Sequence, residues 1–351
     1  MKFSQPVLAA LCASLAAAAP TFQTLDFSEY TSSAVGKRAD PSLVGYLGAF
    51  FLGDEPSVYF YRSNGNDPLS FSALNGGNPV ITPTLGTGGV RDPTIIAGGG
   101  DEAGKKWYII GTDLDIAKTT WDAAQRTGSR GILVWESTDL VTWTSERLVA
   151  VEDATAGMVW APEAIWDAAE GKYLVYWASK FYGAADSSHA GSPSATKIRA
   201  AHTSDFKTFT APVDYVDYSP TNVIDLTFLP LGGDAYARFI KNETATNVFA
   251  EVSADGLFGT WTRPGGAGAI VQQGVEGPAA YWDNAVDGRA YLLLDFFGGD
   301  GYAPFVSDDV EAGAAAWAAA DKSAWPAQLR HGSVLPVDQA GYDRLGGAAF
   351  A

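Results

Sequence analysis

Cysteine is almost absent from this chain of 351 residues, because Cys12 is the only one. No disulfide can form within the chain, so its stability must come from a large hydrophobic core. The composition can supply such a core, since 47% of the residues are hydrophobic and 13% are aromatic.

Positive charge is also scarce. The 23 Lys and Arg residues face 40 Asp and Glu residues, which gives a net charge of -17. Binding to nucleic acid needs a basic surface, so no nucleic-acid partner is expected. An acidic surface also repels polyanionic substrates, and a neutral partner fits better.

Long hydrophobic runs are missing except at the N-terminus. Lys2 precedes an apolar stretch from Pro6 to Ala19 that ends in small residues, which is typical of a secretory signal peptide. The stretch is too short to span a bilayer, which takes about 20 residues. We therefore predict a signal peptide over residues 1–19, a secreted, extracellular protein and no membrane anchor. Asn242 begins an Asn-Glu-Thr glycosylation acceptor sequence, which is compatible with secretion.

A second processing site follows the signal peptide. Residues 20–38 are polar, show no clear periodicity and end in the dibasic pair Lys37-Arg38, which kexin-like proteases cut. We predict that residues 20–38 form a propeptide and that residues 39–351 form a single domain. The alternative for Lys37-Arg38 is an ordinary pair of solvated charges.

A short turn sequence recurs five times, at intervals of about 50–75 residues. It consists of a Ser, an Asp soon after it, an apolar residue and then an aromatic residue. The copies are Ser63–Phe71, Ser137–Trp143, Ser204–Phe209, Ser253–Trp261 and Ser307–Trp317. Repeats of this size that contain several strands are typical of β-propeller blades.

Two kinds of strand-like segment lie ahead of the turns. Segments rich in aromatic and β-branched residues are Val58–Tyr61, Trp107–Thr112, Tyr173–Ser179, Tyr236–Ile240 and Tyr291–Phe297. Apolar segments headed by a polar residue are 91–96, 160–166, 223–229, 275–281 and 330–335. Each unit is therefore interpreted as a polar-headed strand, an aromatic strand, the turn and an outer strand.

The two ends of the chain complement each other. The polar-headed segment 330–335 has no partner after it, and the aromatic segments within 46–71 have no polar-headed segment before them. We predict an all-β fold, a five-bladed β-propeller closed by N- and C-terminal strands that share one blade. An open β-sandwich is the alternative, but it does not explain the complementary ends.

The innermost strand of each propeller blade lines the axial channel, so the heads of the five polar segments are expected to converge. The head residues are Asp92, Glu163, Asp225, Glu276 and His331. Like charges brought together raise some pKa values, and cleavage of a glycosidic bond needs one acid and one base carboxylate.

Each head residue alone also has a structural explanation, since Asp92 before Pro93 can simply start a strand. The argument rests on the joint pattern of one polar residue at an equivalent position in every repeat. Aromatic residues near these segments are candidates for stacking on a sugar ring, and they are Trp160, Trp166, Tyr182 and Phe297.

The ordered set of motifs resembles glycoside hydrolase family 43. The motifs are Arg91-Asp92-Pro93, Trp160-Ala161-Pro162-Glu163, Ile224-Asp225, Glu276-Gly277-Pro278 and His331-Gly332. With Gly-Ser-Arg at 128–130 and the segment 134–140, the chain resembles more narrowly the arabinofuranosidase-like branch, in a secreted fungal form. The resemblance covers residues 43–345.

This resemblance implies an inverting glycosidase on a five-bladed propeller. It implies Asp92 as general base, Glu276 as general acid and Asp225 as the carboxylate that orients the acid and tunes its pKa. The implied substrate-binding residues are Arg91, Trp160, Glu163, Arg330 and His331. Glu163 departs from the Asp that the family usually has there.

The resemblance implies no required cofactor, and a structural calcium ion near His331 is the one metal that it allows. We expect a monomer acting on a neutral oligo- or polysaccharide. The predicted reaction is release of a terminal pentose, foremost α-L-arabinofuranose, from plant cell-wall-type glycans.

Three alternatives remain open: a β-xylosidase of the same family, a retaining fructan hydrolase of the related five-bladed type, and a non-catalytic sugar-binding propeller. The fructan alternative lacks an Asn-Asp-Pro segment at a strand head, because Asn66-Asp67-Pro68 lies in a turn. The non-catalytic alternative leaves three matched carboxylates unexplained. If Asp92 and Glu276 are not the catalytic pair, Glu163 and Asp113 are the next candidates.

Overall fold

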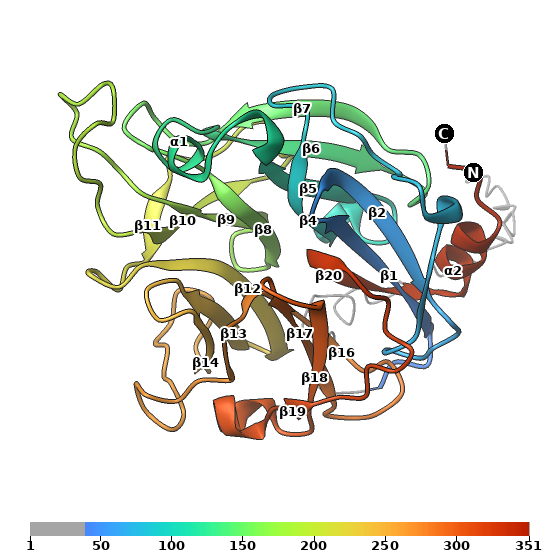
Figure 1. The fold of residues 1–351 in the computed structure, drawn as a ribbon. Coiled ribbons are helices and arrows are strands. Elements are labelled where there is room, and N and C mark those ends of the chain that lie inside the picture. Colours follow the sequence, from blue (N-terminus) through green and yellow to red (C-terminus); the bar gives the residue numbers. More distant parts are fainter. Residues whose placement is uncertain (1–38, 351) are drawn as a thin grey trace, which may run out of the picture.

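The computed structural model describes residues 39–350, so the predicted signal peptide and propeptide lie outside the described residues. Residues 39–350 form five four-stranded antiparallel sheets, arranged as blades in a ring (Figure 1). This arrangement confirms the predicted five-bladed β-propeller. None of the helices in this range is long and apolar enough to cross a membrane.

Each blade is named by its strands in sheet order. The β4–β7 blade contains β4 (Val90–Ala97), β5 (Trp107–Asp113), β6 (Gly131–Ser137) and β7 (Thr144–Ala150). The β8–β11 blade contains β8 (Trp160–Asp167), β9 (Lys172–Ser179), β10 (Lys197–Thr203) and β11 (Val213–Val216). The β12–β15 blade contains β12 (Val223–Gly232), β13 (Ala235–Asn242), β14 (Asn247–Ser253) and β15 (Gln272–Gln273). The β16–β19 blade contains β16 (Glu276–Trp282), β17 (Ala290–Phe296), β18 (Gly301–Ser307) and β19 (Ala318–Ala319).

The fifth blade closes the ring with both ends of the chain. It contains β20 (Leu329–Asp338), β1 (Leu43–Leu52), β2 (Glu55–Ser63) and β3 (Phe71–Ala73). β1 pairs with β20 along most of its length, and Figure 1 shows the blue and red strands side by side. This pairing confirms the predicted shared blade.

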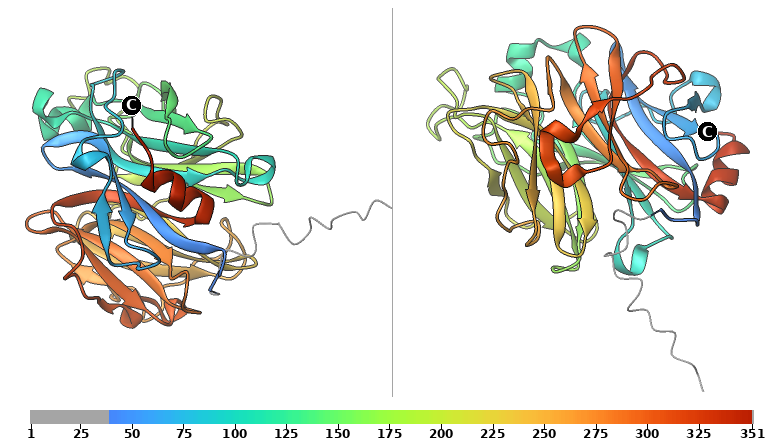
Figure 2. Two further views of the ribbon diagram at one scale, coloured as in Figure 1. Left: turned by 90° about the vertical axis from the view of Figure 1, so that its right-hand side faces the viewer. Right: turned by 90° about the horizontal axis from the view of Figure 1, so that it is seen from below.

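Helix α2 (Gln339–Gly346) covers the outside of the closing blade (Figure 2). Tyr342 anchors it, because its hydroxyl donates to the carbonyl of Ser63 at 2.9 Å and accepts from the amide of Gly65 at 2.7 Å. Arg62 also donates to the carbonyl of Tyr342 at 3.0 Å. The C-terminal helix is therefore attached to the turn that follows β2.

The recurring turn joins the third strand of each blade to the fourth. In the β4–β7 blade, the hydroxyl of Ser137 accepts from the amide of Leu140 at 2.9 Å, and the carboxylate of Asp139 accepts from the amides of Val141 and Thr142 at 2.9 and 2.7 Å. Leu140 has a φ of 66°. The Ser and Asp side chains thus satisfy the backbone donors of a tight turn, which explains why these residue types recur.

The three-strand interpretation of each unit was incomplete. A further strand (β6, β10, β14 or β18) lies between the aromatic strand and the turn. In the closing blade, the segment Val58–Tyr61 lies in β2, which is the third strand rather than the second. Second and third strands are equally buried and apolar, so their composition does not separate them.

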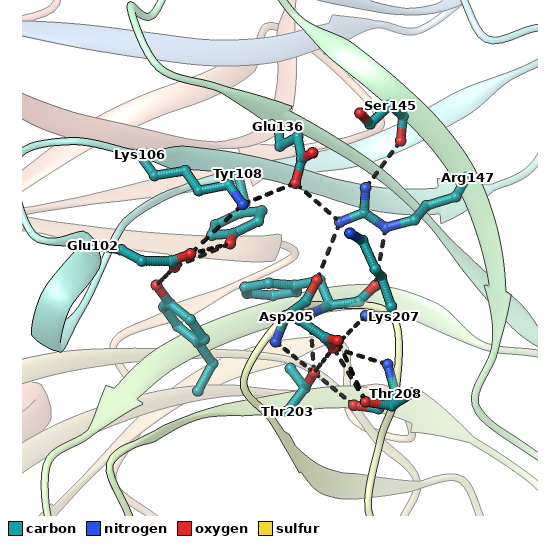
Figure 3. Close-up of polar contacts among 12 residues, drawn as sticks. Glu102, Lys106, Tyr108, Glu136, Ser145, Arg147, Thr203, Asp205, Lys207 and Thr208 are labelled. Carbon is teal, nitrogen blue, oxygen red and sulfur yellow. Dashed lines mark hydrogen bonds and ion pairs between the residues drawn. The ribbon is translucent and has the colours of Figure 1, made fainter.

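The hydrophobic core is divided among the gaps between neighbouring blades. Five buried clusters each combine residues of two adjacent blades. At the edge of one such gap, Arg147 of β7 donates to the carbonyls of Asp205 and Phe206 in the next blade (Figure 3). Tyr173 donates across the same gap to Glu102 at 2.7 Å. Blade-to-blade packing therefore holds the five inner strands in fixed positions around the axis.

Candidate active site

The inner strands begin with a β-bulge at the end that faces the axial site. The pairing register with the second strand shifts there in β4, β8, β12 and β16. One residue of each bulge has a positive φ, and these residues are Asp92, Ala161, Asp225 and Gly277. Bulges redirect side chains and are common beside active sites.

Aligned on this bulge, the five head residues are not at equivalent positions, which corrects the sequence interpretation. Asp92 and Asp225 are themselves the bulge residues, whereas Glu276 precedes its bulge residue Gly277. Glu163 follows its bulge residue by two positions. The head residues converge because the bulges turn side chains from different register positions towards the axis.

His331 links two of the carboxylates on one side of the site. Its Nδ1 atom lies 3.3 Å from Asp92 Oδ1, and its Nε2 atom lies 3.9 Å from Glu163 Oε1. Burial alone would lower the pKa of His331, but these two carboxylates hold it well above its ordinary value. The imidazole is therefore a buried cation between two acids.

Asp92 is held in its ionised form. Burial alone would raise the pKa of Asp92, but the hydrogen bond and charge of His331, with Arg91 and Thr112, keep it below its ordinary value. The Thr112 hydroxyl donates to Asp92 Oδ2 at 2.7 Å and accepts from the amide of Ala161 at 2.7 Å. With 18% of its side chain exposed, Asp92 can still reach a ligand.

Glu163 lies on the other side of the His331 ring from Asp92, and only 8% of its side chain is exposed. The Tyr176 hydroxyl donates to Glu163 Oε2 at 3.2 Å, and Oε1 is buried without a hydrogen-bond partner among the described residues. Burial raises the pKa of Glu163, although His331 opposes the rise. The position of Glu163 favours a role in supporting His331 rather than a direct contact with a substrate.

Glu276 on the other side of the site is held by two cations. Lys241 Nζ lies 2.7 Å from Glu276 Oε2, and Arg330 Nη2 lies 3.4 Å from Oε1. Lys241 also pairs with Glu243 at 2.5 Å, and Arg330 pairs with the buried Asp295 at 2.7 Å. The Glu276 side chain is 25% exposed, so it is the more accessible member of each pair that it forms.

Asp225 contacts the residue that follows Glu276, because its carboxylate accepts a hydrogen bond from the amide of Gly277 at 3.0 Å. Burial raises its pKa to about 7, with His331 and Lys241 opposing the rise and Glu276 and Asp92 adding to it. Asp225 therefore keeps its proton in mildly acidic solution, where Asp92 is ionised.

Arg91 and Trp160 lie near the heads of β4 and β8, beside further aromatic rings. The Arg91 guanidinium is 4.4 Å from the centre of the Phe51 ring and 5.4 Å from that of Trp121. Trp121, on the short helix α1 (Trp121–Arg126), forms an edge-to-face contact with Trp160 at 6.0 Å. These aromatic residues form a wall beside Asp92.

Two of the predicted stacking residues are not available to a sugar. Trp166 packs against Tyr173 near the opposite end of β8. Tyr182 is 5% exposed and its ring is covered by His189. Phe297, in contrast, is 44% exposed, and its ring centre lies 5.1 Å from Lys241 Nζ.

Lys241, Asp295 and Thr112 were missed at the sequence level. Each lies near the end of a second strand and pairs with the head of an inner strand, as in Arg91 with Thr112 and Glu276 with Asp295. The sequence feature that could have identified them is a polar residue at the end of a strand that otherwise consists of aromatic and β-branched residues. Antiparallel pairing places such a residue beside the head of the neighbouring strand.

The described residues do not fit a calcium ion on His331. No group of three or more His, Cys, Asp or Glu side chains within residues 39–350 could hold a metal ion. Both ring nitrogens of His331 face carboxylates and its pKa is raised, so the ring offers no lone pair. Calcium, moreover, prefers oxygen ligands.

The glycosylation acceptor Asn242 lies at the end of β13, next to Lys241. Its side-chain oxygen accepts from the amide of Ala245 at 2.9 Å, within the turn to β14. The acceptor sequence is therefore on the same face of the propeller as the site.

Comparison with known proteins finds one matching family model and one curated relative. A family model described as a probable glycosyl hydrolase domain, related to glycoside hydrolase family 43, matches residues 41–343. An alpha-L-arabinofuranosidase of Bifidobacterium longum subsp. longum is 33% identical over an alignment of 213 residues, and the match covers 57% of this chain and 20% of that protein. The chain thus spans about a fifth of the length of this curated relative.

Solved structures of similar shape include two arabinofuranosidases. The catalytic domain of a GH62 alpha-L-arabinofuranosidase from Coprinopsis cinerea has a TM-score of 0.47 and 15% identity, covering 71% of this chain and 74% of that one. An alpha-L-arabinofuranosidase from Fusarium graminearum, in complex with an iminosugar inhibitor, has a TM-score of 0.47 and 15% identity, covering 83% and 84%. No functional argument rests on likenesses at this level.

Proposed function

The chain belongs to the family of probable glycosyl hydrolase domains related to glycoside hydrolase family 43, and on this premise we propose that it is an inverting glycosidase. The observation that carries the proposal is the pair Asp92 and Glu276. They are the accessible carboxylates of the site, and each is held by different partners from neighbouring strands. Cleavage with inversion needs two such carboxyl groups with separate roles.

The proposed reaction is a single displacement. The Asp92 carboxylate takes a proton from water while the water oxygen bonds to the anomeric carbon. The bond from that carbon to the leaving oxygen breaks as the Glu276 carboxyl group donates its proton to this oxygen. The products are a sugar of inverted configuration and the free alcohol, with Asp92 protonated and Glu276 ionised.

The surroundings of the two groups support these roles. His331, Arg91 and Thr112 keep the pKa of Asp92 low, as a base that must be ionised requires. Lys241 and Arg330 stabilise the Glu276 carboxylate that forms when the proton leaves.

Asp225 itself is the second candidate for the acid. Its pKa of about 7 means that it holds a proton when Asp92 does not, which is the property expected of a general acid. Burial argues against it, because only 7% of the residue is exposed and its Oδ2 atom is engaged by the amide of Gly277. Leaving-group dependence separates the two assignments.

We propose α-L-arabinofuranose as the released sugar, because the relative from Bifidobacterium longum is an alpha-L-arabinofuranosidase. A β-xyloside is the alternative substrate. The reaction as proposed needs no cofactor, and we propose that the protein acts as a secreted monomer on neutral plant cell-wall-type glycans.

Hydrolysis of nitrophenyl α-L-arabinofuranoside, β-D-xyloside and β-D-galactoside, followed by proton NMR at early times, tests the proposal. We expect the arabinofuranoside to react fastest and the first sugar released to have the inverted anomeric configuration. Retention would exclude the single displacement and favour the fructan-type mechanism. Hydrolysis of none of the glycosides would favour a sugar-binding propeller.

A further inference from the structure

A cleft of about 600 Å³ lies on the outer part of the β16–β19 blade. Its lining includes Gly274, Phe296, Gly298, Ala303 and Phe305. Phe296 and Phe305 have nearly parallel rings with centres 6.5 Å apart. A volume of this size is within the range of sites for small ligands, roughly 300–1,000 Å³.

The cleft begins beside Glu276. Gly274 precedes Glu276 by two positions, and Phe296 follows Asp295, which is the cross-strand partner of Glu276. Phe297 is exposed next to Lys241, and Lys241 contacts Glu276 at 2.7 Å. The inner end of the cleft and the residue assigned as acid are therefore on the same side of the axial site.

The walls of the cleft combine apolar rings with backbone segments and the ion pair of Asp300 with Lys322. β19 is only two residues long and pairs with Phe305 and Val306, so the half of β18 nearer the site has no outer strand among the described residues. Gly298 adds open space, since a Cβ atom there would meet nothing within 4 Å. Aromatic faces with nearby backbone donors and acceptors suit a sugar, which has apolar C–H faces and hydroxyl groups.

We propose that this cleft binds the leaving-group part of the substrate, an unbranched neutral pentose oligosaccharide, and that Phe297 is a specificity residue at its entrance. The inference rests on the proposed function, because a general acid must contact the leaving oxygen. The chain attached to that oxygen therefore leaves on the Glu276 side, where the cleft begins. The site would then favour a polymer-derived substrate over a small glycoside.

The first test compares two substrates in three variants. The first substrate is a linear arabino- or xylo-oligosaccharide that carries terminal arabinofuranose. For Phe297→Ala and Gly298→Trp, we expect kcat/KM on this substrate to fall about tenfold, which corresponds to the loss of roughly one ring contact. For Gly298→Trp, the value on nitrophenyl α-L-arabinofuranoside should change less than about twofold, since its leaving group ends near Glu276. Phe258→Ala is the matched control, because Phe258 is 58% exposed in the loop after β14, at the opposite face.

The second test measures binding without turnover. In an Asp92→Asn background, calorimetry with unsubstituted linear arabino- and xylo-oligosaccharides should show weaker binding when Phe297→Ala or Gly298→Trp is added. The oligosaccharide that binds more tightly identifies the sugar in the main chain of the substrate. Equal binding by all variants, or an equal loss of kcat/KM on both substrates, would overturn the cleft assignment while leaving the glycosidase intact. Failure of wild type to hydrolyse any glycoside would instead reject the proposed function.

Discussion

The two sides of the axial site hold their carboxylates by different means. On the Asp92 side, the buried imidazole of His331 lies between two acids, while the charge of Arg91 and the hydroxyl of Thr112 also act on Asp92. On the Glu276 side, two cations serve Glu276, and each also pairs with a further acid. The two sides thus differ in how their cations are shared: one imidazole contacts two acids on the first side, whereas two cations contact the single carboxylate of Glu276 on the second.

The two acids around His331 differ in their distance from its ring and in the direction of their pKa shifts. Asp92 lies 3.3 Å from the ring and Glu163 lies 3.9 Å from it. The pKa of Asp92 is lowered, whereas burial raises that of Glu163 despite the same cation. The closer contact with His331, together with Arg91 and Thr112, shifts the pKa of Asp92 in the opposite direction from that of Glu163.

Asp92→Asn is expected to have the largest effect, because it removes the carboxylate assigned as general base. Activity should fall by about 10²–10⁴-fold on every substrate, whatever its leaving group. The measurement is kcat/KM on aryl arabinofuranosides of graded leaving-group pKa. Asp167→Asn is the matched control, since Asp167 forms a similar pair with His202 at 3.0 Å near the far end of β8. A folded Asp92→Asn variant that kept more than about a tenth of wild-type activity would contradict the assignment.

Glu276→Gln should give a smaller loss that depends on the leaving group. Substrates with a poorly acidic leaving alcohol need its proton and should slow by about 10²–10³-fold, whereas dinitrophenyl glycosides should be nearly unaffected. A plot of log kcat/KM against leaving-group pKa measures the dependence. If Asp225→Asn shows this steep slope and Glu276→Gln does not, Asp225 is the acid.

Lys241→Met and Asp225→Asn should shift the pH profile in opposite directions, each by about one pH unit. Lys241 lies 2.7 Å from Glu276, so removing this positive charge should move the alkaline limb of kcat/KM to higher pH. Asp225 carries its negative charge above about pH 7, so its removal should move that limb to lower pH. Lys197→Met, which removes another ion-paired lysine, is the control. Shifts of the same sign would show that the two residues do not act through Glu276.

Much of the fold was predictable because its signals are local. The aromatic strands and the Ser-Asp turns are encoded within about ten residues, and hydrogen bonds such as those of Asp139 explain the turns. The third strands were missed, since β6 and β5 have the same apolar character and differ only in their pairing partners. The third turn copy, Ser204–Phe209, was misplaced by one residue, because Thr203 rather than Ser204 accepts from the amide of Phe206.

The sequence alone determined the five-bladed ring, its closure by β1 and β20, and the set of acids at the strand heads. Only the tertiary structure decided which acids are paired and which carry protons. Asp92 and His331 are 239 positions apart, and Lys241 reaches Glu276 from another blade. A pKa depends on burial and on charges a few ångströms away, and these are set when the blades pack around the axis.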